Sequence, residues 1–385
     1  MRRIYLDHAA TTRTAPEVID AVVQAMQVDW GNASSSHAQG QSARRMVDAA
    51  RIAVATLVGA RPEEIYFTSG ATESVNWAVG LAPEFIQGRG DRLVSSAIEH
   101  PCGLESAGRA QARGWITAAA RVDSGGILDL GSFQEALAVK TALVSVMLAN
   151  NETGTIQPVK EAARMAREAG ALFHTDATQA IGRTRVDVNE LGVDYLSLSA
   201  HKFYGPKGVG ALYVRKGAPL EPFMRGGEQE RGKRAGTFNV PGIAGLGVAA
   251  DMAVEFLDKR ADHARSIRDA LEQGLLSRIT GTELNGCREP RLPSHLNIYF
   301  PGVDAEALLM ALDVAGIAVS TGSACSSGTT EPSHVLTAMG IPRARALSAM
   351  RFTSGEDNVA EESGLVLEAV VTAVERLRRS SPRAL

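Results

Sequence analysis

Short hydrophobic runs alternate with amphipathic segments between about residues 65 and 215. The runs predict strands at 65–68, 92–96, 142–148, 171–174, 196–199 and 210–214. Between two of them, Val159 to Ala169 has the pattern of an amphipathic helix, and the following Gly170 is typical of a helix end. Strands that alternate with helices indicate an α/β fold, in which a mostly parallel sheet carries helices on both faces.

The pattern changes after about residue 240. It predicts a long helical segment to about 279, a strand over 294–300, a helix near 304–315, a strand-like run over 346–353 and a last helix over 358–379. We interpret this half as a smaller α+β domain, to which the first dozen residues return. The expected division is a large domain over 13–255 and a small domain formed by 1–12 and 256–385.

Composition narrows the classes of protein without choosing a function. The 385 residues are 45% hydrophobic and 22% charged with a net charge of −3, which gives no electrostatic case for binding nucleic acid or a membrane. No apolar run is long enough for a membrane span or a signal peptide. Three cysteines cannot form a disulfide framework, and no CxxC pair indicates a metal. We therefore expect a cytoplasmic protein in a reducing setting, with no metal.

Lys202 lies just after the predicted strand that ends at Ser199, and His201 precedes it directly. A loop rich in glycine and proline follows. A lysine at a strand end can form a Schiff base if its amine is desolvated and its neighbours bind an anion. An enzyme holds pyridoxal phosphate (PLP) in this way. The alternative is a surface lysine in a turn.

Other predicted strands also end in residues that a PLP site uses. The loop Ser69–Ser74 leads into a helix, which suits a phosphate. Asp176 could keep the pyridine nitrogen protonated, and Gln179 could reach the phenolic oxygen. His100 could stack on the ring and move protons, and Asn151 could bind cofactor or substrate. Each has an ordinary alternative as a cap, turn or surface residue, but their occurrence together favours a site.

Two features of the second half suggest further chemistry. The segment 320–328 is small and polar, with Cys325 in its middle, so its thiol is available for reaction. Arg351 lies inside an apolar strand, where a guanidinium needs an anion such as a substrate carboxylate. The alternatives are a cysteine that only happens to lie in a loop and an arginine paired with an internal Asp or Glu.

In their order along the chain these motifs resemble the NifS/IscS-type cysteine desulfurases, PLP enzymes of the class V aminotransferase branch. The resemblance rests on Tyr5–Thr12, Ser69–Ser74, His100, Asn150–Glu152, Asp176–Gln179, Ser199–Gly208, Arg231–Thr237, Ser320–Ser327 and Met350–Phe352. It implies the aspartate aminotransferase-like fold (fold type I). That fold has a large PLP-binding domain with a mostly parallel seven-stranded sheet, and a smaller α+β domain that carries the catalytic cysteine.

The resemblance also implies the roles of individual residues. Lys202 would bind PLP and remove the substrate α proton, Cys325 would accept the sulfur, and His100 would handle protons. The implied cofactor-binding residues are Ala71, Thr72, His100, Asn151, Asp176, Gln179, Ser199, His201, Lys202 and Thr237. Thr237 would reach the phosphate of the neighbouring subunit in a homodimer. Asn151 and Arg351 would bind the substrate carboxylate.

The implied reaction converts L-cysteine to L-alanine and leaves a persulfide on Cys325. A protein of iron–sulfur cluster assembly or of another thiolation pathway would accept the sulfur. A selenocysteine lyase or a class V aminotransferase would share the PLP residues, and a scaffold of a sulfur-transfer complex is a further alternative. Cys102, two residues after His100, is unusual for the family. It is either a second redox-active thiol or a packed bystander. Arg225, Glu228, Phe238 and Thr321 are further departures, near the expected subunit contact and entry.

Overall fold

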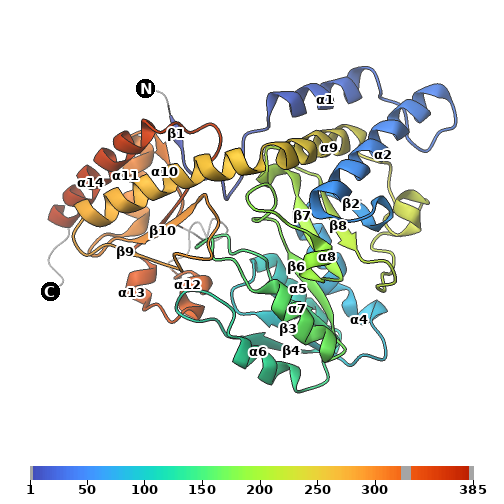
Figure 1. Cartoon of the computed structure of the whole chain (residues 1–385), viewed down its shortest axis with the longest axis horizontal. Helices are drawn as coiled ribbons and strands as arrows, with labels where there is room; N and C mark the ends of the chain where they lie inside the picture. The colour runs from blue at the N-terminus through green and yellow to red at the C-terminus, as the bar shows by residue number, and fades with distance from the viewer. Residues whose placement is uncertain (1–2, 322–330, 381–385) are drawn as a thin grey trace.

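The computed structural model describes residues 3–321 and 331–380. Its larger part is built on a seven-stranded sheet (Figure 1) with the order β2-β8-β7-β6-β5-β3-β4. The strands are β2 (Ile65–Thr68), β3 (Arg92–Ser96), β4 (Ile116–Ala120), β5 (Leu143–Ser145), β6 (Leu172–Asp176), β7 (Tyr195–Ser199) and β8 (Gly210–Val214). Strand β8 runs antiparallel to both β2 and β7, and the other neighbours are parallel. The predicted mostly parallel seven-stranded sheet is confirmed.

Successive residues of the central strands face two different hydrophobic cores. Leu143 and Leu172 belong to one core, whereas their neighbours Val144 and Phe173 belong to the other. This alternation follows from the two-residue period of a strand. Because both faces are covered, the strands read as continuous hydrophobic runs, and this made them recognisable in the sequence.

Helices cover both faces of this sheet. One core includes residues of α1 (Pro16–Gln27), α2 (Ala38–Val58), α6 (Leu130–Leu137), α7 (Val159–Glu168) and α9 (Val240–Glu255). The other includes residues of α3 (Ala71–Val75), the π-helical turn Asn76–Gly80, α4 (Ala82–Phe85) and α5 (Pro101–Ala112). The sheet is therefore the middle layer of three.

A second, smaller sheet has its own core. Strand β10 (His295–Tyr299) pairs antiparallel with β12 (Ala349–Thr353) and β9 (Glu283–Leu284). Its core also takes residues from α10 (Leu257–Arg278), α11 (Ala305–Val314) and α14 (Glu362–Ser380). The chain start lies against this part, because β1 (Ile4–Tyr5) pairs with β11 (Ile317–Ala318). Short helices α8 (Val188–Leu191), α12 (His334–Ala338) and α13 (Arg343–Ala346) complete the fold.

The long helical segment predicted after residue 240 is two helices. α9 and α10 meet at Phe256, where they are bent by 74° relative to each other; Figure 1 shows them following one another across the molecule. We propose that the large domain spans 13–255 and that 1–12 and 256–385 form the small domain, and the break at Phe256 supports this boundary. Among the described residues no single helix is long and apolar enough to cross a membrane, and α9 with α10 passes that test only as a bent pair.

Some element boundaries differ from the sequence prediction. β5 ends at Ser145, not at 148, because the N–H of Met147 donates to the Glu99 carboxylate (2.7 Å) and not to a neighbouring strand. Ala346, predicted in a strand, ends α13, which follows Pro342. α14 begins at 362 and not at 358, because Asn358 closes a turn with Gly355 (2.9 Å).

Candidate active site at the strand ends

A cavity of about 460 Å³ lies where the carboxyl ends of the parallel strands meet. The predicted site residues that line it are Ala71, Thr72, His100, Asn151, Asp176, Gln179, Ser199, His201 and Lys202. Arg351 and Thr237 do not line it, and Cys325 lies outside the described residues. The structure thus brings together residues from five strand ends that are spread over more than 100 positions of the sequence.

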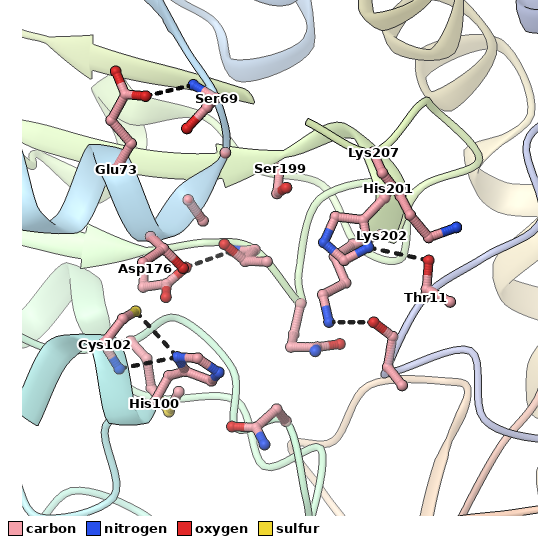
Figure 2. A pocket seen from close by; sticks show the side chains of 18 of the residues that line it. Thr11, Ser69, Glu73, His100, Cys102, Asp176, Ser199, His201, Lys202 and Lys207 are labelled. Atoms are coloured by element: carbon pink, nitrogen blue, oxygen red, sulfur yellow. Dashed lines mark hydrogen bonds between the residues drawn. The ribbon is translucent and has the colours of Figure 1, made fainter. Parts of the chain in front are cut away.

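The amine of Lys202 is held against the amino-terminal segment. It follows β7 in a short 3-10 turn, and its Nζ donates to the carbonyl oxygens of Ala9 (2.6 Å) and Ala10 (2.8 Å), as Figure 2 shows for one of them. Burial, helped by the positive charges of Arg183 and Arg351, lowers the pKa of Lys202 to about 8. A larger share of this amine is therefore neutral, and hence nucleophilic, near physiological pH than of an ordinary lysine.

Asp176 ends β6 and points into the cavity (Figure 2). Its Oδ1 accepts a hydrogen bond from the N–H of Thr178 (3.0 Å), so it closes a local turn, whereas the alternative interpretation made it the N-cap of a helix. Behind it, His174 is fully buried between Ser145 Oγ (2.8 Å) and Ser197 Oγ (2.9 Å). Burial lowers the pKa of His174 to about 4, so the imidazole two residues before Asp176 is neutral.

Unpaired buried polar atoms at this place fit the predicted cofactor. Gln179 is buried and its Nε2 donates to Ala9 O (2.9 Å), but its Oε1 has no partner among the described residues. The hydroxyl of Thr178 is buried and lacks a partner in the same way. A buried polar atom without a hydrogen bond is costly. The ring hydroxyl of PLP would satisfy the Gln179 oxygen, so the residues present fit that group.

The other end of the cavity suits a phosphate. Gly70, with φ +151, turns the chain from β2 into α3, whose first N–H groups at Ala71 and Thr72 have no partner within the helix. A side chain at Gly70 would approach Ser199 Oγ to 3.4 Å. His201 Nδ1 lies 3.1 Å from Thr11 Oγ1 (Figure 2), and burial, with nearby lysines, lowers the pKa of His201 to about 4. Backbone donors, hydroxyl and imidazole together can cradle an anion.

The loop before α3 is itself fixed by a carboxylate. Glu73 accepts from the N–H of Ser69 (2.9 Å) and forms a bidentate pair with Arg234 (2.9 and 3.2 Å). The hydrogen bonds from Arg234 and Ser69 keep the pKa of Glu73 below its usual value although burial opposes them. No role was predicted for Glu73 or Arg234, because their pairing joins positions 161 residues apart.

His100 lies between β3 and α5 and is the N-cap of that helix. Its Nδ1 accepts from the N–H of Cys102 (3.2 Å) and lies 3.0 Å from Cys102 Sγ (Figure 2). Burial is the largest cause that lowers the pKa of His100, and Lys202 and His334 act in the same direction, whereas Asp176 opposes them. His100 is therefore a mainly neutral imidazole on the cavity wall.

Arg351 has the internal partner that was the alternative interpretation. It lies buried on β12 and forms an ion pair with Asp7 (2.7 Å), and it donates to the Asn151 carbonyl oxygen (2.7 Å). Asn151 itself lines the cavity. The guanidinium thus lies next to the cavity, because it is hydrogen-bonded to the main chain of the lining residue Asn151. Its contact with a substrate stays a prediction.

Thr237 lies on the surface, in the segment that precedes α9. This segment is fixed by Glu230, whose carboxylate forms a buried bidentate pair with Arg51 (2.7 and 2.9 Å) and accepts from the N–H of Phe67 (3.1 Å). Both Glu230 (φ +48) and Arg231 (φ +58) adopt the left-handed backbone conformation. The contacts of Glu230 stabilise this strained backbone conformation and so fix the start of the segment.

Comparison with known proteins agrees with this geometry. The aminotransferase class-V family profile matches residues 4–362. A cysteine desulfurase of Gluconacetobacter diazotrophicus is 46% identical, over 99% of this chain and 96% of its own length. A cysteine desulfurase IscS of Dictyoglomus turgidum is 43% identical, over 99% and 97%. A solved NifS-like protein superposes with a TM-score of 0.91 at 38% identity, covering 97% of this chain and all of its own.

Proposed function

The chain belongs to the aminotransferase class-V family and is a PLP-dependent cysteine desulfurase, and we propose that the cavity at the strand ends converts L-cysteine to L-alanine while Cys325 takes the sulfur. One observation supports this site above all. The cavity gathers Lys202, Asp176, Gln179 and His100, and it leaves the Gln179 Oε1 buried without a partner. A buried acceptor without a partner is costly, and a ligand bound in the cavity would offset that cost.

Each residue of the cavity has a task in this proposal. PLP, when bound, withdraws electrons from the substrate Cα and Cβ. Lys202 holds the cofactor and takes the proton from Cα, which its lowered pKa of about 8 favours. Asp176 would pair with the ring nitrogen, and Gln179 would bind the ring hydroxyl. The backbone N–H groups at Ala71 and Thr72, with Ser199 and His201, would hold the phosphate.

Asn151 and Arg351 would orient the substrate carboxylate. Arg351 is fixed by Asp7 and by the Asn151 carbonyl oxygen, so a carboxylate that reaches Asn151 comes within the field of a positioned guanidinium. His100 faces the same cavity and would handle a proton at the substrate sulfur. A positioned substrate is needed because the proton is removed from Cα, whereas the thiolate attacks the sulfur on the adjacent Cβ.

Cys325 is the proposed sulfur acceptor. Its thiolate would attack the substrate sulfur, so that an S–S bond forms, the Cβ–S bond breaks and the electron pair of that bond stays on carbon. Protonation of that carbon gives alanine. Cys325 lies outside the described residues, and its role rests on the sequence motif 320–327. The described part of the chain reaches Thr321 before Cys325 and resumes at residue 331 after it. There Ser333 donates a hydrogen bond to the buried Glu152 carboxylate (2.6 Å).

A homodimer completes the proposal. Thr237 is exposed and does not line the cavity of its own chain, which suits a residue that binds the phosphate in a neighbouring subunit. The persulfide would pass to an acceptor protein of iron–sulfur assembly or of another thiolation pathway. A free thiol carrier favours a reducing, cytoplasmic compartment.

Mass spectrometry after exposure to L-cysteine without reductant tests the assignment of Cys325. We expect one added sulfur atom on the peptide that carries Cys325, and loss of both this adduct and most alanine formation in Cys325→Ala. Cys287→Ala is the matched control and should behave as the unchanged protein, since Cys287 does not line the cavity. Full alanine output from Cys325→Ala would refute the persulfide role and favour a lyase such as a selenocysteine lyase, whereas an aminotransferase would form no alanine from L-cysteine because it leaves the Cβ–S bond intact.

A further inference from the structure

We propose that Cys102 is a positioning residue, which holds His100 in the tautomer that carries its proton on Nε2. In this state His100 presents a hydrogen-bond donor, and not an acceptor, to a substrate in the cavity. The inference rests on the proposed desulfurase function for its consequence in catalysis. The tautomer of His100 in the protein without substrate can be tested independently of turnover.

The argument begins at His100 Nδ1. The backbone N–H of Cys102 lies 3.2 Å from this nitrogen and can only donate, so Nδ1 must be an acceptor without a proton. The Sγ of Cys102 lies 3.0 Å from the same nitrogen. A neutral imidazole carries one proton, which is then on Nε2. Two groups of one residue thus fix the tautomer (Figure 2).

The thiol can serve as the second donor because it keeps its proton. Burial raises the pKa of Cys102 far above that of an ordinary thiol, and the nearby carboxyl groups of Asp176 and Glu99 add to this. The Thr72 side chain is hydrogen-bonded to the thiol and opposes the shift only in part. Because the thiolate is the nucleophile, the structure favours a hydrogen-bonding role for Cys102 over the alternative of a second redox-active thiol.

The surroundings also keep His100 from taking a second proton. The positive end of the α5 dipole meets the imidazole at its N-cap position. Lys202 after β7 and His334 at the start of α12 add positive charge, and only Asp176 at the end of β6 favours the imidazolium. The carboxylate of Glu99, another acid close to His100 in sequence, is engaged elsewhere, because its Oε1 accepts the N–H of Met147 (2.7 Å).

Nuclear magnetic resonance of the PLP-loaded protein with ¹⁵N-labelled histidine rings tests the tautomer directly. His100→Asn identifies the His100 signals among the eight histidines. We expect the unchanged protein and Cys102→Ser to carry the proton on Nε2 at neutral pH, because a serine hydroxyl still donates. Cys102→Ala keeps only the backbone donor and should show a larger fraction of other protonation states.

Kinetics give a second readout of the same variants. Loss of one hydrogen bond predicts that kcat for alanine formation falls roughly three- to tenfold in Cys102→Ala with KM nearly unchanged. In Cys102→Ala the pKa of the acid limb of the pH–activity profile should rise toward the ordinary histidine value of about 6.5, because water enters the space of the thiol and solvates His100. Cys102→Ser should keep kcat and the acid limb of the unchanged protein.

Several results would overturn the inference. They are a proton on Nδ1 or on both ring nitrogens of His100 in the unchanged protein, equal losses in the Ala and Ser variants, or no change in the Ala variant. The spectrum of the unchanged protein decides even if a variant does not fold. If the unchanged protein makes no alanine, the proposed function fails, but the spectrum still tests Cys102 separately.

Discussion

Burial sets the acid–base behaviour of the side chains in this cavity. His174 and His201 both have their pKa lowered to about 4, so both are neutral at physiological pH. Lys202 has its pKa lowered to about 8 by the same cause. One physical effect, the cost of charge in a poorly solvated place, thus produces neutral hydrogen-bonding imidazoles and a more nucleophilic amine.

The pH dependence of cofactor attachment tests the state of Lys202. Only the neutral amine attacks a carbonyl, and the neutral fraction rises with pH through the pKa. For Lys202 the rate of PLP attachment to the cofactor-free protein should therefore rise up to about pH 8 and level off above it. The appearance of visible absorbance after mixing measures this rate. A rate that still rises near the ordinary lysine value of 10.5 would contradict the lowered pKa.

At the scale of elements, strands and helices differ in how well the sequence predicts them. β2, β3 and β8 were predicted to the residue, because hydrophobic runs bounded by polar turns mark buried strands. β4 (Ile116–Ala120) was missed, since it lies at the sheet edge, partly exposed, and is mostly alanine. The bend at Phe256 carried no recognised breaker residue such as Gly or Pro.

The site was predictable in part for the same reason. Asp176, His100 and Lys202 follow recognisable strands, so the topology of a parallel sheet places them at one edge. The contacts of Lys202 with Ala9 and Ala10 were not predictable, because they use main-chain oxygens nearly 200 residues away. Long-range main-chain contacts leave no pattern of residue types.

The buried pair of Arg51 with Glu230 fixes the segment that leads to Thr237. Glu230→Gln should lower the free energy of unfolding by about 3 kcal/mol, because it leaves a buried guanidinium without its counter-charge. Chemical denaturation measures this change. PLP release from the same variant should also be faster.

Glu161→Gln is the matched control for this prediction. Glu161 pairs with Arg164 on the exposed face of α7, and there we expect no measurable change in stability. Equal stability of both variants would show that the Arg51–Glu230 pair does not hold the segment.

At the scale of the whole molecule, the account predicts a site shared between two subunits. A complete site would need Lys202 of one subunit and Thr237 of the other. Thr237→Asp, whose charge repels a phosphate, and Lys202→Ala should each be nearly inactive alone. When the two are unfolded and refolded together, mixed dimers with one intact site should regain alanine formation. No gain on mixing, or a monomer in sedimentation analysis, would contradict the shared site.

The central claim is that this cavity converts L-cysteine to L-alanine through Lys202. The most direct measurement is alanine and sulfide formation from L-cysteine, with a reductant, by the unchanged protein and by Lys202→Ala. Lys216→Ala, an exposed lysine away from the cavity, is the control. The account predicts equal amounts of alanine and sulfide from the unchanged protein and the control, and none from Lys202→Ala. Turnover by Lys202→Ala at the rate of the unchanged protein would contradict it.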